Sequence, residues 1–221
     1  GYYNSVEPFP VFTVSAITAF IALLNHPDCT PAKFESLKVI VSGGAPIPPT
    51  VVEEFRARTG HYIHSGYGLT ETNAGVIAVP HKAVAPVDPA TGALAIGAPK
   101  FNARVWIADE NGKPAPVGEA GEIVVSGPAV SPGYWNKPKE TAEAMREDGF
   151  RTGDIAFMDA QGWFYIVDRK KDMIVASGFK VWPREVEDVL YGHPAVREAA
   201  VIGVTDPYRG ETVKAVVSLK P

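Results

Sequence analysis

The sequence predicts a mixed α/β and α+β fold built from three successive units. In the first unit a strand, a glycine-rich turn, a helix and another strand follow one another, which is the order of an open α/β sheet. From about Lys100 the pattern changes to short strands separated by turn signals, as in a small antiparallel β-barrel or sandwich. After Asp172 a strand, a helix and two more strands make a third, α+β unit.

The first unit opens with an apolar strand and an amphipathic helix. Residues 11–14 are apolar or β-branched and predict a short buried strand. Ser15 is a suitable N-cap for the helix that follows. The apolar side chains at helical spacing are Ile17, Phe20, Ile21 and Leu24. We therefore expect one face of this helix to pack on the sheet.

A second strand, turn and helix follow. The β-branched run at residues 37–41 precedes a glycine-rich bend at residues 42–46, and Pro48-Pro49 open a helix that Gly60 ends. Another strand is expected at residues 62–64. Ligands of open α/β sheets gather where strands end. The bend at 42–46 and the glycine-rich stretch at 66–72, which we expect to be a second turn, should therefore face one crevice.

The second and third units are assigned from turn chemistry and alternation. Asn111-Gly112, between apolar runs at 104–108 and 122–126, is a strong hairpin signal. The other expected elements are a polar helix at 138–147, strands at 155–158, 163–167 and 173–176, a helix at 183–191, and strands at 196–203 and 212–219.

Composition excludes several classes of function. The chain has 221 residues, 46% of them hydrophobic, which is sufficient for a substantial core. Its formal charge of −4 argues against a nucleic-acid or anionic-membrane surface, since both require an excess of Lys and Arg. We expect a small-molecule ligand and no nucleic acid.

Cysteine and histidine usage excludes two kinds of stabilisation. The single cysteine, Cys29, cannot form an internal disulfide, which favours a reducing, cytoplasmic environment. The five histidines are scattered, and we expect no structural metal. The longest apolar run, residues 11–24, is shorter than the roughly 20 residues that span a bilayer, so no transmembrane segment is expected.

Residues 66–72, with the sequence GYGLTET, carry the groups that a nucleotide site needs. Tyr67 can stack on a base, Thr70 can donate to a phosphate, and Glu71 can bind a hard cation such as Mg²⁺. An ordinary glycine-rich turn with an exposed glutamate would show the same residues. The pattern leaves both interpretations open.

Six ordered motifs give the chain a specific resemblance. They are SGGAP at 42–46, GYGLTET at 66–72, GEIVVSGPAVSPGYWNKPKET at 121–141, RTGD at 151–154, DRKKDMI at 168–174 and SGFKVWPREVE at 177–187. In this order and spacing they resemble the adenylate-forming (acyl-activating, AMP-binding) superfamily, and within it most closely the long-chain fatty acid–CoA ligases.

The resemblance implies an activity and a domain organisation. Such enzymes use ATP and Mg²⁺ to convert a carboxylate, here a fatty acid or another acid, into an acyl-adenylate, and then transfer the acyl group to coenzyme A. Residues 1–98 would be the end of the large α/β subdomain, 99–168 the β-barrel subdomain, and 169–221 the first half of a mobile C-terminal lid domain.

The resemblance also assigns roles in the nucleotide site. Gly43, Gly44 and Ala45 would line the adenine and acyl crevice. Tyr67, between Gly66 and Gly68, would pack on the adenine. Thr70 would contact the α-phosphate, and Glu71 would bind Mg²⁺.

The later motifs would hold the ribose and move the lid. Asp154 and Arg169 would bind the ribose hydroxyls, Lys171 would be the hinge of the lid, and Gly178 and Phe179 would face the pantetheine channel. Without the resemblance, residues 169–171 would be a solvated basic run and 178–179 an ordinary turn. For Trp182 we favour a core or interface role.

Two elements of the resemblance are missing from these 221 residues. The Ser/Thr/Gly-rich phosphate loop and the C-terminal catalytic lysine have no counterpart, so we expect a segment of a larger ligase that is inactive alone. Two alternatives remain open: a non-catalytic module that binds AMP or a protein, and a segment of an acyl-AMP ligase that acylates a carrier protein. Acyl chain length and a possible homodimer are also left open.

Overall fold

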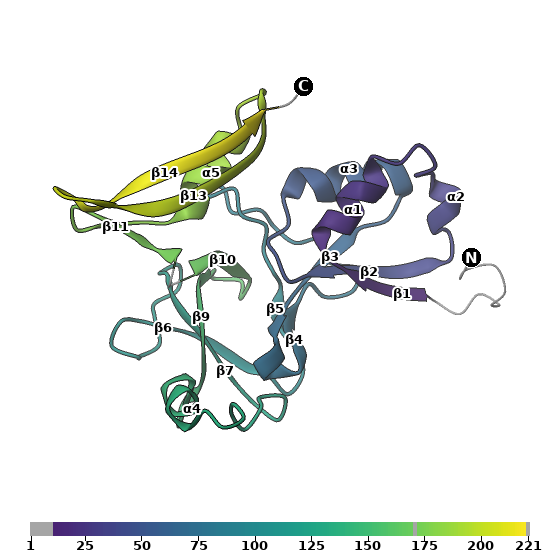
Figure 1. Ribbon diagram of the computed structural model, residues 1–221. Coiled ribbons are helices and arrows are strands. Elements are labelled where there is room, and N and C mark those ends of the chain that lie inside the picture. Colours follow the sequence, from purple (N-terminus) through teal and green to yellow (C-terminus); the bar gives the residue numbers. More distant parts are fainter. Residues whose placement is uncertain (1–10, 170–171, 220–221) are drawn as a thin grey trace.

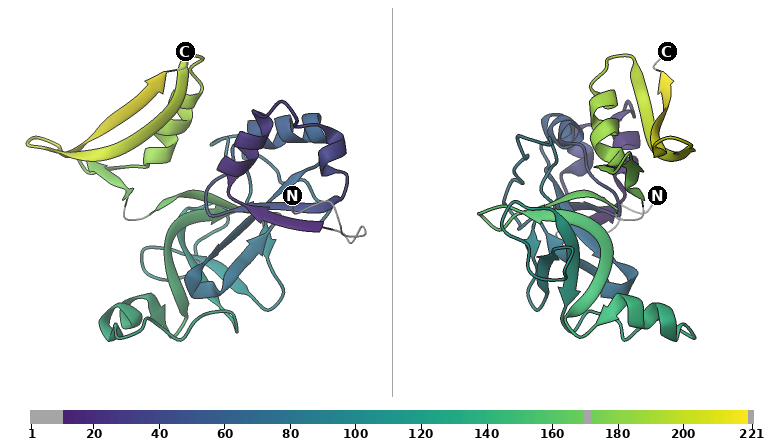
Figure 2. Two further views of the ribbon diagram at one scale, coloured as in Figure 1. Left: turned by 45° about the vertical axis from the view of Figure 1, so that its right-hand side comes forward. Right: turned by 90° about the vertical axis from the view of Figure 1, so that its left-hand side faces the viewer.

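The structure, a computed structural model, describes residues 11–169 and 172–219 and contains three sheets (Figure 1). The first sheet has the strand order β1-β2-β3-β4-β5, the second β10-β9-β7-β6 with β8 paired to β9, and the third β12-β11-β14-β13. The mixed α/β fold expected from the sequence is confirmed. In the views of Figures 1 and 2 the third sheet and its helix form a separate lobe beside the other two.

The first sheet is formed by elements that follow the expected order. They are β1 (Val11–Ser15), α1 (Ile17–Leu24), α2 (Pro31–Phe34), β2 (Leu37–Gly43), α3 (Pro49–Thr59), β3 (Ile63–Leu69), the 3₁₀ turn η1 (Thr70–Thr72), β4 (Ala74–Ala78) and β5 (Ala98–Pro99). Strands β1, β2 and β3 are parallel, whereas β4 and β5 are antiparallel. Gly60 ends α3 in the left-handed conformation, as expected for a C-terminal glycine.

The helices pack on one face of this sheet through aromatic side chains. Phe55 of α3 is fully buried, and Phe20 and Phe34 meet it edge-on with ring centroids 5.6 and 5.3 Å away. Edge-to-face pairs of this kind add to the stabilisation from burial. The α1–α3 layer therefore holds the strand ends that carry the glycine motifs.

Three expectations for the N-terminal strand and helix are wrong. Strand β1 forms, but the side chains of Phe12 and Val14 are 60% and 59% exposed. They are exposed because β1 is the edge strand and only one of its faces meets the helices. The N-cap of α1 is Ala16 rather than Ser15, and no side chain caps the helix. Ile21, expected on the inner face, is 37% exposed.

The second sheet is a curved, antiparallel half-barrel. Its elements are β6 (Arg104–Ala108), β7 (Gly121–Ser126), α4 (Pro138–Ala144), β8 (Met145–Arg146), β9 (Gly149–Met158) and β10 (Phe164–Arg169). The helix expected at 138–147 ends at Ala144, because Met145 is extended and β8 pairs with β9. Asn111-Gly112 does form a tight turn, closed by the bond from the Gly112 amide to the Asp109 carbonyl, within the longer loop 109–120.

Backbone hydrogen bonds join the first two sheets. The amide of Ile96 donates to the Phe164 carbonyl at 2.8 Å, and the amide of Phe164 donates to the Gly97 carbonyl at 3.0 Å. A shared apolar cluster lies between these sheets, made of Val76, Ile77, Ile96, Ile107, Ile123, Val125, Ala156 and Phe164. The sheets are therefore held as one packed body.

The third sheet carries one helix on one face (Figure 2). Its elements are β11 (Ile174–Ala176), β12 (Phe179–Val181), α5 (Pro183–Tyr191), β13 (Val196–Asp206) and β14 (Gly210–Leu219). A hydrogen bond from the Val201 amide to the Glu187 carboxylate, at 2.8 Å, ties α5 to β13. Among the helices of the described residues, none has the length and apolarity needed to cross a bilayer.

Candidate functional site

The two glycine motifs of the first sheet lie side by side. Gly43, the last residue of β2, is paired in register with Gly66 of β3. A Cβ on Gly43 would stand 2.8 Å from the Gly66 carbonyl oxygen, closer than such contacts occur. Gly43 thus allows the strand ends to approach, and Gly44 and Ala45 continue from it in an exposed bend.

The stretch GYGLTET was expected to be a turn, and this is wrong for its first half. Gly66, Tyr67 and Gly68 belong to strand β3, which pairs with β4, a strand that the sequence did not predict. A Cβ on Gly68 would stand 2.0 Å from the Ala74 carbonyl oxygen, so glycine is required here by backbone packing. The reversal itself lies at Asn73 and Ala74, whose φ angles of 48° and 98° are positive.

The reversal after β3 is held by a residue that the sequence interpretation did not select. The buried Thr72 hydroxyl accepts a hydrogen bond from the Leu69 amide at 2.9 Å and lies 2.8 Å from the Ala74 carbonyl, to which it can donate. Local side-chain bonds of this type replace backbone pairs in tight turns. They fix η1, on which Thr70 is exposed and Glu71 half-buried.

Tyr67 and Asp154 meet across the first two sheets. The Tyr67 hydroxyl donates to the Asp154 Oδ2 atom at 2.6 Å, a short charge-assisted bond between half-buried residues. The Tyr67 ring packs against the apolar cluster shared by the two sheets. Two motifs that are 87 residues apart in the sequence are thereby brought into contact.

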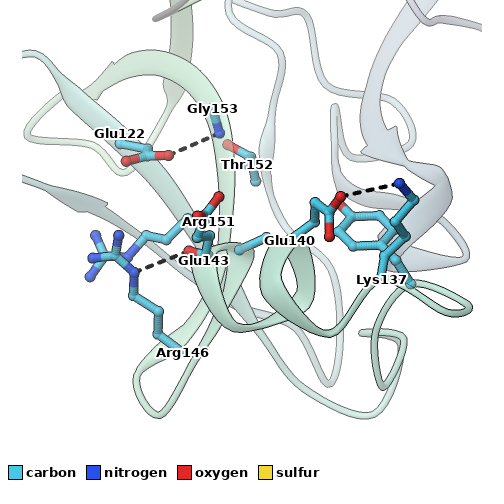
Figure 3. Close-up of a pocket in the computed structure, with 10 residues that line it drawn as sticks. Glu122, Lys137, Glu140, Glu143, Arg146, Arg151, Thr152 and Gly153 are labelled. Atoms are coloured by element: carbon cyan, nitrogen blue, oxygen red, sulfur yellow. Dashed lines mark hydrogen bonds and ion pairs between the residues drawn. The ribbon is translucent and has the colours of Figure 1, made fainter.

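A second set of bonds fixes the turn that carries Asp154. The Gly153 amide donates to Glu122 Oε1 at 3.0 Å, a contact visible in Figure 3. The Thr152 hydroxyl donates to the Ile123 carbonyl at 2.9 Å and accepts from the Asp154 amide at 3.2 Å. The sequence interpretation did not select Glu122. Its position beside Ile123, within the GEI segment of a recognised motif, was the one signal that could have pointed to it.

The other residues of the ribose and hinge motifs are only partly described. The backbone of Arg169, the last residue of β10, pairs with Asp154 of β9, so the two residues expected to hold the ribose are neighbours in one ladder. Lys171 lies outside the described residues. Further along the chain, the Arg184 amide donates to Asp168 Oδ2 at 3.1 Å.

Of the expected pantetheine-facing residues, Gly178 lies in the β11–β12 turn and Phe179 is the first residue of β12. Gly178 has a φ of 84°, in the left-handed region, and Phe179 is 75% exposed. The next residue, Lys180, forms an ion pair with Glu110 of the half-barrel. The turn is therefore held near the second sheet, with the Phe179 ring facing solvent. Trp182, for which we favoured packing, is half-buried.

Glu71 is the candidate metal ligand, and its carboxylate is held from the second sheet. The Tyr134 hydroxyl donates to Glu71 Oε1 at 2.8 Å. Burial and the Glu71 carboxylate together raise the pKa of the Tyr134 phenol to about 12, so it is a protonated donor at neutral pH.

The surroundings of Glu71 fit Mg²⁺ rather than a caged metal. Among the described residues no three His, Cys, Asp or Glu side chains form a metal-binding group. Mg²⁺ is commonly held by one or two carboxylates together with substrate phosphates and water. A single carboxylate, on the residue that follows Thr70 in η1, is consistent with that mode of binding.

A groove of about 570 Å³ lies between α4 and β9 (Figure 3). Its lining residues are Glu122, Tyr134, Lys137, Glu140, Glu143, Ala144, Arg146, Arg151, Thr152 and Gly153. Three acidic and three basic side chains give it no net charge preference. None of the residues expected to bind nucleotide lines it, but Tyr134 and Gly153 connect it to Glu71 and Asp154.

Comparison with protein families gives two matches. Residues 10–135 match the family described as AMP-binding enzyme, and residues 185–221 match the AMP-binding enzyme C-terminal domain. The first match contains the glycine-rich bend, Tyr67, Thr70, Glu71 and Tyr134.

Individual proteins of known name are also similar. The long-chain-fatty-acid–CoA ligase of Bacillus subtilis (strain 168) is 43% identical over 215 residues, which cover 96% of this chain and 37% of that protein. The feruloyl-CoA synthase of an Amycolatopsis species is likewise 43% identical, over 97% of this chain and 43% of that protein. This chain therefore spans about two fifths of the length of these relatives.

A solved structure shows the same arrangement. The crystal structure of ATP-bound MatB from Rhodopseudomonas palustris superposes with a TM-score of 0.84 at 35% sequence identity, covering 93% of this chain and 40% of that one. The similarity extends over all three sheets rather than over one alone.

Proposed function

Because the chain belongs to the AMP-binding enzyme family, we propose that it is a segment of an ATP-dependent fatty acid–CoA ligase. In the first step a carboxylate oxygen attacks the α-phosphorus of ATP, giving an acyl-adenylate and pyrophosphate. In the second the thiol of coenzyme A attacks the acyl carbon, giving a thioester and AMP. The thiol proton leaves with the released AMP or passes to solvent.

The Tyr67–Asp154 hydrogen bond is the observation that carries this proposal. It joins the aromatic of GYGLTET to the carboxylate of RTGD at 2.6 Å. A nucleoside has a flat base and a pair of ribose hydroxyls, which suit an aromatic ring and a carboxylate placed side by side. In this proposal Tyr67 packs on the adenine and Asp154 accepts from the ribose, with the neighbouring Arg169 as a second ribose contact.

The strand ends and η1 would hold the reacting groups. Gly43, Gly44 and Ala45 would form the wall of the adenine and acyl crevice, where a side chain on Gly43 would also collide with Gly66. Thr70 would donate to the α-phosphate, and Glu71 would hold Mg²⁺. When bound, the cation would neutralise charge on the phosphate oxygens.

The third sheet would act in the second step. In this proposal Lys171 would be the hinge, and Gly178 and Phe179 would face pantetheine after the lid turns. The exposure of Phe179, at 75%, is compatible with a ring that is covered only when a ligand or another lid orientation meets it. This proposal keeps the units 1–98, 99–168 and 169–221 as α/β subdomain, half-barrel and start of the lid.

The proposed acid is a fatty acid, and the proposed acceptor is coenzyme A. The relatives support both, since the Bacillus subtilis protein is named a long-chain-fatty-acid–CoA ligase. The feruloyl-CoA synthase has the same identity of 43%, which makes an aromatic acid the second candidate. Comparing a long-chain fatty acid with ferulic acid as substrates of the full-length protein would decide between them.

Calorimetric titration of AMP into the 221-residue chain tests the nucleotide site. We expect saturable binding, and we expect Asp154→Ala to weaken it by about 10- to 100-fold, because hydrogen bonds to a charged group contribute about 1.5–3 kcal/mol. Asp28→Ala, at an exposed position after α1, is the control and should bind AMP normally. Failure of the unmodified chain to bind AMP would contradict the proposed site.

An exchange assay separates the ligase from a binding module. This chain covers about two fifths of its relatives, so we propose that alone it exchanges little or no pyrophosphate into ATP. The full-length protein should catalyse that exchange in the presence of a fatty acid. A full-length protein that binds AMP but gives no exchange would favour the non-catalytic alternative.

A further inference from the structure

Tyr134 contacts the proposed metal ligand from a different part of the chain. Its hydroxyl donates to Glu71 Oε1 at 2.8 Å, although the two residues are 63 positions apart. Tyr134 lies in the loop between β7 and α4, whereas Glu71 lies on η1. The contact therefore crosses from the second sheet to the first.

The same loop also bonds to the Glu71 backbone and to the side chain of Asn73, two residues further on. The Ser131 amide donates to the Glu71 carbonyl at 2.7 Å, and the Asn73 side-chain amide donates to the Ala129 carbonyl at 3.0 Å. These bonds fix the position of η1 relative to the loop. The Tyr134 hydroxyl is thus one of three contacts, and the only one of them that reaches the Glu71 carboxylate.

Tyr134 is itself held in place by α4. Its amide donates to the Thr141 hydroxyl at 2.9 Å, and its carbonyl accepts from the Lys137 amide at 3.2 Å. Gly133 packs so closely on Thr141 that a Cβ would stand 2.5 Å from its methyl group. The phenol is therefore presented to Glu71 by a fixed backbone.

The chemistry of the contact suits a carboxylate that binds a cation. A phenol donating to one carboxylate oxygen restricts rotation of the carboxylate and stabilises its charged form. Groups that hydrogen-bond to a ligating side chain commonly orient it, and their loss costs about 10- to 100-fold in metal affinity or activity. Within the described part of the chain, no Lys, Arg or His side chain forms an ion pair with the Glu71 carboxylate.

We infer that Tyr134 is a positioning residue that orients Glu71 for Mg²⁺ bound together with a nucleotide. This inference rests on the proposed nucleotide site and extends it by one residue of the second sheet. The phenol does not touch the nucleotide. Its effect is confined to the part of nucleotide affinity that depends on the divalent cation.

The test compares ATP binding with and without the cation. The dissociation constant of ATP is measured for the unmodified chain and for Tyr134→Phe, once in saturating MgCl₂ and once in excess EDTA. Tyr134→Phe removes only the hydroxyl. Tyr208→Phe, at a 94% exposed tyrosine in the β13–β14 turn, is the matched control, and thermal unfolding verifies that each variant is folded.

We expect MgCl₂ to tighten ATP binding by the unmodified chain and by Tyr208→Phe. In Tyr134→Phe that tightening should shrink by about 10-fold or more, while affinity in EDTA is unchanged. Glu71→Gln should abolish the tightening, and adding Tyr134→Phe to it should have no further effect on ATP binding.

Three results would overturn the inference. An unchanged cation effect in Tyr134→Phe would show that the phenol does not position Glu71. Loss of affinity in EDTA as well would indicate a general structural role. ATP binding without any effect of MgCl₂ in the unmodified chain would remove the metal role of Glu71 and leave the nucleotide site standing, whereas absence of ATP and AMP binding would contradict the proposed function itself.

Discussion

The Tyr67 hydroxyl lies 2.6 Å from Asp154 Oδ2 and links strand β3 of the first sheet to strand β9 of the second. The Tyr134–Glu71 bond runs in the opposite direction, from a donor in the second sheet to an acceptor in the first. Each sheet thus supplies one tyrosine and one carboxylate to the candidate site.

Tyr67→Phe should separate the hydroxyl from the ring. We expect the free energy of unfolding to fall by about 1.5–3 kcal/mol, because a charge-assisted hydrogen bond is lost, and we expect AMP to bind more weakly because Asp154 is no longer held. Urea denaturation and AMP titration measure the two effects. Tyr165→Phe is the matched control. The Tyr165 hydroxyl also donates to a carboxylate, Asp159 Oδ2 at 3.0 Å, but this bond lies outside the candidate site. It should reduce stability and leave AMP affinity intact; equal AMP affinity in both variants would argue against the role of Tyr67.

Gly68→Ala should destabilise the fold. The new methyl group would stand 2.0 Å from the Ala74 carbonyl oxygen, so β3 or β4 must shift, at a cost of about 1–3 kcal/mol. Gly75→Ala, on the partner strand, would meet backbone atoms at an ordinary 3.6 Å and should be tolerated. Thermal unfolding of the two variants decides the matter, and equal melting temperatures would contradict the packing explanation for Gly68.

The Tyr134–Glu71 bond should make stability fall at high pH. The pKa of Tyr134 is raised from 10.0 to about 12 in the folded chain. The stabilising contribution is therefore complete below pH 10 and is lost as the pH rises through about 12, where the phenol ionises beside a carboxylate. Unfolding free energies of the unmodified chain and Tyr134→Phe, measured across this window, should converge as the pH increases. Parallel curves would show that the phenol does not titrate against Glu71.

His64 should give a pH dependence of the opposite sign. Burial beneath neighbouring rings, with a smaller effect of the His81 charge, lowers the pKa of the His64 imidazole from 6.5. Its Nδ1 lies 3.2 Å from the Ile40 carbonyl, and its Nε2 has no partner within the described residues. Stability should be complete above pH 6.5 and decline as the pH falls through the lower folded value. His64→Leu should show less of this acid-side decline in urea denaturation; an unaltered decline would assign it to other groups.

The sequence predicted elements best where one local signal decides the structure. Gly60 ends α3 because a helix C-terminus often requires a left-handed residue, and helix α5 has the expected bounds 183–191. Ser15 failed as a cap because the chain enters α1 one residue later, at Ala16. Local sequence signals do not specify which of two adjacent residues, here Ser15 or Ala16, becomes the N-cap of the helix.

Strand β4 was missed for a different reason. The Gly-rich stretch at 66–68 reads as a turn when taken alone, but its glycines serve the close approach of β3 to β2 and β4. Such close approaches depend on which strands pair, and paired strands can be distant from each other in sequence. The exposure of Phe12 and Val14 has the same origin, since burial of an edge strand depends on what covers it.

The predicted site residues rest on motifs that could be recognised in the sequence, and their roles stay predictions. The Tyr67–Asp154 contact was not predicted, and Glu122, Thr72 and Tyr134 likewise act through hydrogen bonds that composition does not reveal. A glutamate in GEI or a tyrosine in a loop has many possible environments. Only the pairing of the two sheets specifies which partner each one meets.

The crossed tyrosine–carboxylate pairs between the first two sheets restrict how this part of the molecule can be recombined. Replacing the first sheet by that of another protein removes Tyr67 and Glu71 together and leaves Asp154 and Tyr134 without their partners. A chimera that takes the first sheet from one protein and the second from another would keep both hydrogen bonds only if each source protein has the same donor and acceptor at these positions. The first two sheets would therefore have to be exchanged together, and an exchange of the third sheet would have to preserve the contacts of Lys180 with Glu110 and of Arg184 with Asp168.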